Sequence, residues 1–140
     1  MSASRVRRHL LAVVCAGGLV VAAGCGGGPK AIPVSGTATL DGQPLEGFLI
    51  SFNPDAAKGN SPRVQCAGRI GGDGRYSLTT DDGSKQKPGA PAGWYKVTIS
   101  SPDDKPIPVN SKYTDYNKTD LTVEVVESAP PGAYDLKFTK

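Results

Sequence analysis

The most reactive side chains in this sequence are its three cysteine thiols. Cys25 follows Ala23 and Gly24, whose small side chains let a backbone enter a protease site in extended form. A thiol placed directly after such a cleavage point can take a diacylglyceryl group through a thioether bond. Cys15 follows the bulky, β-branched Val14, so the same chemistry is not expected there.

The segment before Cys25 has the organisation that this chemistry needs. Its first nine residues hold three arginines and no acidic residue, and residues 10–24 are then uncharged. Fifteen residues are too few for a membrane-spanning helix, which needs about 20, but they match the charged start and apolar middle of a signal peptide. Residues 21–25 read Val-Ala-Ala-Gly-Cys and resemble the bacterial lipobox, with Ala22 where lipoboxes prefer leucine.

We therefore expect a signal peptide over residues 1–24, signal cleavage between Gly24 and Cys25, and palmitate-type lipidation of Cys25. Two or three acyl chains anchor firmly, because each buried CH₂ contributes roughly 0.8 kcal/mol. The expected partner is a lipid membrane, and the expected location is the bacterial cell envelope, facing the periplasm or the cell surface. The alternatives are an uncleaved signal anchor or an ordinary signal peptide cut near Ala23.

The charge of the chain is concentrated at its start. Arg5, Arg7 and Arg8 account for the whole net charge of +3, since the other 13 basic residues match the 13 acidic ones. No basic surface is left for nucleic acid. The only histidine, His9, lies in the same segment, so the mature domain lacks the usual general base, triad partner and transition-metal ligand. The sequence predicts no enzyme and no cofactor.

Two further groups of polar residues are candidates for ligands. Cys66 shares a predicted strand face with Val64 and Ile70, which favours a core position, and a reactive or intermolecular thiol is the alternative. Several aspartates could supply oxygens to calcium, but the EF-hand spacing is absent and turn geometry explains them, so no metal is expected. These aspartates are Asp73, Asp81, Asp82, Asp103 and Asp104.

Aromatic side chains offer a different kind of site. Trp94, Tyr113 and Tyr116 could stack on sugar rings and form a carbohydrate-binding surface, although one of the two tyrosines is expected to pack onto the sandwich. Tyr95 alternates with Trp94 and is expected to point into the core. An envelope protein or a glycan is therefore a candidate partner, with Trp94, Tyr113 and Tyr116 as the candidate contacts.

The elements that would hold these residues are short strands. After Cys25 no segment shows sustained helical periodicity, whereas seven segments alternate apolar and polar residues with period two. Glycine (18) and proline (12) supply the many turns that short strands require. The alternating segments are residues 34–40, 48–52, 64–70, 76–79, 95–99, 121–125 and 134–138.

This pattern predicts a seven-stranded antiparallel Greek-key β-sandwich over residues 34–140. A flexible glycine-rich tether is expected over residues 25–33. The longer connections, residues 54–63 and 101–119, are expected to lie on the surface.

A family resemblance supports the same fold. Residues 34–45, 73–78 and 91–97 resemble carboxypeptidase regulatory-like domains, over about residues 34–100. The resemblance implies a transthyretin-like sandwich and leaves function undefined, because one fold hosts many functions. The fold also occurs in a purine-pathway hydrolase, whose histidines and Tyr-Arg-Gly-Ser ending have no counterpart here. Residues 112–115 and 121–125 are similar to the tail of small bacterial envelope lipoproteins. The sequence thus predicts a membrane-anchored lipoprotein with a non-catalytic sandwich. The alternatives are a carbohydrate-binding module or an atypical histidine-free enzyme.

Overall fold

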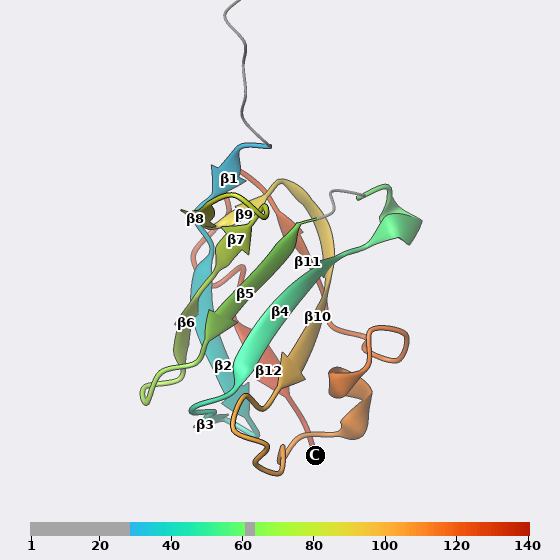
Figure 1. Cartoon of the computed structure of the whole chain (residues 1–140). Helices are drawn as coiled ribbons and strands as arrows, with labels where there is room; N and C mark the ends of the chain where they lie inside the picture. Colours follow the sequence, from blue (N-terminus) through green and yellow to red (C-terminus); the bar gives the residue numbers. More distant parts are fainter. Residues whose placement is uncertain (1–28, 61–63) are drawn as a thin grey trace, which may run out of the picture.

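The computed structural model describes residues 29–60 and 64–140, and this part of the chain is all-β (Figure 1). The predicted signal peptide, the cleavage residues Ala23 and Gly24, and the lipidation residue Cys25 lie outside the described residues. Short strands and two single-turn 3₁₀ helices make up the described elements. They are β1 (Ala31–Ile32), β2 (Ser35–Leu40), β3 (Gln43–Pro44), β4 (Leu49–Pro54), η1 (Ala56–Lys58), β5 (Gln65–Arg69), β6 (Arg75–Ser77), β7 (Thr79–Asp81), β8 (Gln86–Pro88), β9 (Ala90–Pro91), β10 (Gly93–Ser100), η2 (Ser111–Thr114), β11 (Thr122–Val125) and β12 (Leu136–Phe138).

The strands form two main sheets that pack face to face. The larger sheet has the order β11-β10-β4-β5-β7-β8, and all its neighbours are antiparallel. The smaller sheet is built on β2, which pairs with β12, β3 and β6. A short ribbon of β1 and β9 closes one end of the sandwich (Figure 1). The predicted all-β sandwich is confirmed.

The core lies between the sheets and consists of the inward half of each alternating strand. In β10, Tyr95, Val97 and Ile99 are buried, as their spacing predicts. The ring of Phe52 on β4 lies 5.8 Å from that of Tyr95. It also lies 6.3 Å from the ring of Tyr76 on β6, so aromatic contacts join the two sheets.

One strand pairing differs from the fully antiparallel arrangement that the sequence predicts. β12 lies parallel to β2, with Leu136 opposite Ala38 and Phe138 opposite Leu40. The alternation of Leu136 and Phe138 does place both side chains in the core. Alternation determines which face of a strand is buried, but it does not determine the direction of the neighbouring strand.

The ordered domain also begins before the predicted boundary at residue 34. Ala31 and Ile32, which the sequence assigns to the tether, pair with Pro91 and Ala90 and form β1. Ile32 is buried in the core, because β9 offers its backbone and an apolar end of the sandwich beside it. Residues 31 and 32 thus belong to the folded part of the chain.

The two ends of the sandwich carry different parts of the chain. β1, β8 and β9 lie at one end, whereas η2 and the C terminus lie towards the other (Figure 1). No helix in the described part of the chain combines the length and the apolar character needed to cross a bilayer.

Candidate anchoring end and surface sites

The end of the sandwich that carries β1 is where the described chain starts, four residues after Cys25. From Ala31 onward, backbone pairing with β9 fixes the chain to the domain. The preceding Lys30 forms an ion pair with Glu127, with 2.8 Å between Nζ and Oε1. Their hydrogen bond raises the pKa of Lys30 and lowers that of Glu127. Both side chains are exposed, so the pair contributes little stability.

An open groove lies on this end between the start of β2 and the loop that follows β11. Its volume is about 460 Å³. One wall is formed by Ile32 and Pro33, and the other by Val126, Pro130 and Tyr134. Ser35 and Glu127 also line the groove, and Glu127 is its one charged side chain.

The loop over residues 126–134 is held closed by a tyrosine. The hydroxyl of Tyr134 donates to the carbonyl of Val126 at 3.3 Å and accepts from its N–H at 3.2 Å. Val126 is the one large apolar side chain that the described residues leave exposed, at 36%. The Pro-Pro-Gly run of this loop indicates only a turn, so the sequence does not predict the contact between Tyr134 and Val126.

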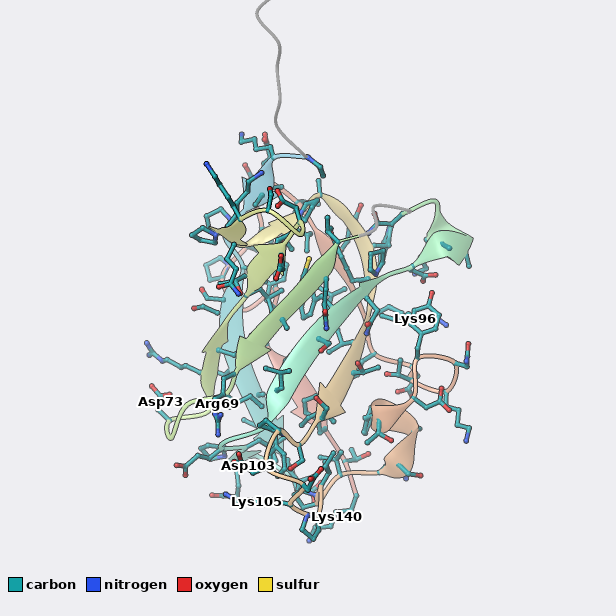
Figure 2. All side chains as sticks on the ribbon, in the orientation of Figure 1. Arg69, Asp73, Lys96, Asp103, Lys105 and Lys140 are labelled. Atoms are coloured by element: carbon teal, nitrogen blue, oxygen red, sulfur yellow. The ribbon has the colours of Figure 1, made fainter. Side chains whose placement is uncertain are left out.

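Trp94 and Tyr116 lie on the surface, and each is half-buried with a lysine beside its ring. The Nζ of Lys58 is 3.7 Å from the Trp94 ring centroid, and the Nζ of Lys96 is 4.8 Å from that of Tyr116. Figure 2 shows Lys96 projecting outward from β10. Lys96 is two residues from Trp94, so the strand period places both side chains on the same face of β10 and could have indicated that Lys96 belongs to this surface. Nothing in the sequence links Lys58 to Trp94.

Of the two tyrosines, Tyr113 is the one that packs onto the sandwich, so it does not belong to this surface. It is 4% exposed and packs edge-on against Phe138, with 5.1 Å between ring centroids. Its hydroxyl lies 3.2 Å from that of Thr139. The single turn of η2 rotates Tyr113 inward, and a loop without strand alternation gives no sequence signal for that direction.

The aspartate side chains in the turns accept hydrogen bonds from backbone N–H groups of the same turns. Asp73 accepts from the N–H of Arg75 at 3.0 Å, and Asp81 from that of Gly83 at 2.8 Å. Asp82 accepts from the N–H groups of Lys85 and Ser84, and these bonds, with that from the Ser84 hydroxyl, hold its pKa far below the usual range. Each aspartate thus acts as a turn cap.

Asp103 lies at the opposite end from β1, between two cations. Its carboxylate is 3.2 Å from Arg69 and 3.8 Å from Lys105, and Figure 2 shows the three side chains together at the lower end. Within residues 29–60 and 64–140, no three histidine, cysteine or acidic side chains come together in a way that could hold a metal ion.

Cys66 is a core residue, as its strand position predicts. Its side chain is fully buried, and its sulfur lies 3.3 Å from the hydroxyl of Thr80. Burial raises the pKa of the thiol, which favours its protonated form over the thiolate. Burial likewise raises the pKa of the adjacent Tyr95 to about 12.

No protein-family model, curated protein or solved structure matches this chain.

Proposed function

We propose that this protein is a bacterial envelope lipoprotein, in which lipid on Cys25 anchors a non-catalytic β-sandwich to a membrane. The observation that carries the proposal is the order of the first 25 residues. An arginine-rich start and a 15-residue uncharged stretch lead directly to Ala23, Gly24 and Cys25. The domain then begins at Ala31, so only a short link separates the lipid from the folded part.

The chemistry of the described surface favours a binding role over catalysis. The acidic side chains in the turns accept backbone hydrogen bonds, and others form exposed ion pairs with lysine or arginine. The only nucleophilic thiol in the described residues is buried and has a raised pKa. Groups arranged in this way stabilise loops and are poorly placed to transfer protons to a substrate.

The proposed family is that of carboxypeptidase regulatory-like domains. The all-β sandwich is compatible with it, and the resemblance over residues 34–100 is the reason for naming it. On this proposal the domain contacts another envelope component through its surface. A carbohydrate-binding role would now depend on Trp94 and Tyr116 alone, each with a lysine beside its ring.

Replacement of single cysteines tests the anchor. Cells producing the full chain are fed a palmitate analogue, and the protein is followed in membrane and soluble fractions. We expect the native protein and the matched control Cys15→Ser to carry the label and to sediment with membranes. Cys25→Ser should lose the label. Equal labelling of Cys25→Ser and the native protein would refute the proposal.

A further inference from the structure

We propose that the end of the sandwich formed by β1, β9 and the loop over residues 126–133 rests on the bilayer to which Cys25 is anchored. We refer to β1, β9 and the loop over residues 126–133 together as the anchoring end. The inference rests on the proposed function, since it requires lipid on Cys25. Beyond the lipid anchor itself, the inference specifies that the anchoring end is the surface that meets the membrane. It also specifies that this surface contacts the lipid headgroups.

The length of the link between Cys25 and β1 limits how far the domain can lie from the membrane. Six residue steps join Cys25 to Ala31, and a fully extended chain of that length spans at most about 20 Å. A glycine-rich coil of the same length has an average span of about 13 Å. The anchoring end is therefore always close to the headgroups.

The opposite end is out of reach of the bilayer when the anchoring end is tethered so closely. A compact domain of this size has a radius of gyration of about 13 Å, so its long dimension exceeds the average span of the link. η2 and the C terminus lie towards the end away from β1 (Figure 1). A rotation that brought η2 to the membrane would have to stretch the link around the domain.

The loop of the anchoring end exposes several apolar side chains. Val126, Pro130, Pro131 and Ala133 are exposed there, and Val126 is the one large apolar side chain that the described residues leave in solvent. The loop over residues 126–133 has a single charged residue, Glu127, and Lys30 neutralises it at 2.8 Å. This loop and Lys30 together have no net charge, so the loop can approach headgroups without a large desolvation cost.

The other end has the composition of a solvated surface. Arg69, Asp73, Asp103, Lys105 and Lys140 project from it (Figure 2). Burial of so many charges against lipid would be unfavourable. The end that carries β1 has charges of its own, since Lys87 of the neighbouring β8 pairs with Asp82 at 3.1 Å. The direction of the domain therefore follows from the link and from the apolar loop over residues 126–133.

The anchoring end is also rigid enough to present its apolar side chains in a fixed arrangement. β1 is paired with β9, and the Tyr134 hydroxyl holds both backbone groups of Val126. The loop over residues 126–133 therefore does not need to fold on contact, and little conformational entropy is lost when it meets the membrane.

Depth-dependent fluorescence quenching tests the proposal on the lipid-bearing full chain. The matched variants are Ser128→Cys on the anchoring end and Ser111→Cys in η2, because both serines are exposed. Each is labelled with an environment-sensitive dye while Cys66 stays buried. The protein is then placed, at low protein-to-lipid ratio, in phosphatidylcholine vesicles that contain a lipid with a headgroup nitroxide.

We expect the nitroxide to quench the dye at Ser128 at least threefold more strongly than the dye at Ser111. Equal or absent quenching at both positions, in protein that floats with the vesicles, would overturn this inference and leave the lipid anchor intact. Dye–dye proximity at Ser128 without lipid quenching would assign the surface to a second copy and also overturn it. Protein that does not float with the vesicles would overturn the proposed function itself.

Discussion

Buried hydroxyl groups in this sandwich donate to backbone carbonyls, and none of the buried side-chain nitrogen or oxygen atoms in the described residues lacks a partner. The phenol of Tyr76 donates to the carbonyl of Tyr134 at 2.5 Å, from β6 to the segment before β12. The hydroxyl of Thr80 donates to the carbonyl of Gly89 at 2.6 Å. These bonds join loops to strands at places where no sheet neighbour supplies a donor.

Removal of one such hydroxyl should lower the free energy of unfolding. Tyr76→Phe leaves the buried carbonyl of Tyr134 without this donor, and we expect a loss of about 1–3 kcal/mol in the free energy of unfolding. The control is Tyr116→Phe, whose half-buried hydroxyl bonds the carbonyl of Pro54 at 3.2 Å and should matter less. Urea unfolding of both variants measures the difference, and equal losses would contradict the assigned roles.

The Asp82 turn should make stability depend on acid pH. Hydrogen bonds from Lys85 and Ser84 lower its pKa in the folded state, whereas in the unfolded chain it returns to its ordinary value near 3.8. Its contribution is thus fully present above pH 4 and declines as the pH falls towards the folded pKa. The stability difference between native protein and Asp82→Ala should therefore shrink between pH 5 and pH 2. A difference that stays constant over this range would contradict the assignment.

At the scale of elements, close contact between β5 and β6 depends on a missing side chain. A Cβ on Gly68 of β5 would overlap the carbonyl of Ser77 on β6. Glycine therefore lets the chain pass from the larger sheet to the smaller one without separating them.

Gly68→Ala should push β5 and β6 apart and cost about 1–3 kcal/mol, as overpacking typically does. Gly72→Ala is the matched control, because a Cβ there meets only the side chain of Glu46 at 3.5 Å. Thermal unfolding of the two variants provides the measurement. Similar melting temperatures for both would show that the contact at Gly68 relaxes freely.

The longer strands follow the alternation that the sequence shows, whereas the predicted strand 76–79 is divided between β6 and β7, which belong to different sheets. β4 and β10 bury Ile50, Phe52, Tyr95 and Val97 as the pattern requires. β1, β3, β8 and β9 have only two or three residues each, too few to establish a period. Their pairing follows from neighbours distant in sequence, which a local pattern does not report.

The candidate site residues could be placed from the sequence only where they lie in alternating strands. Cys66 was placed correctly because it lies in an alternating strand. Which of Tyr113 and Tyr116 packs inward could not be predicted, because the burial of Tyr113 depends on Phe138, 25 residues away in sequence. The lipid-anchor residues Ala23, Gly24 and Cys25 remain a prediction from sequence alone.

At the scale of the whole molecule, the two ends of the sandwich carry different loops. One carries the start of the domain, an exposed valine and a proline-rich loop. The other carries the arginine, lysine and aspartate side chains seen in Figure 2. If lipid on Cys25 anchors the domain as proposed, we expect the end with η2 and the C terminus to face away from the membrane.

The mass of the protein extracted from native membranes tests the central claim most directly. The account predicts a mature chain that begins at Cys25, with a diacylglyceryl group on its sulfur and acyl chains that are released by mild base. Cys66 should be unmodified in the same molecule. A chain that retains residues 1–24, or one that begins at Cys25 with a bare thiol, would contradict the account.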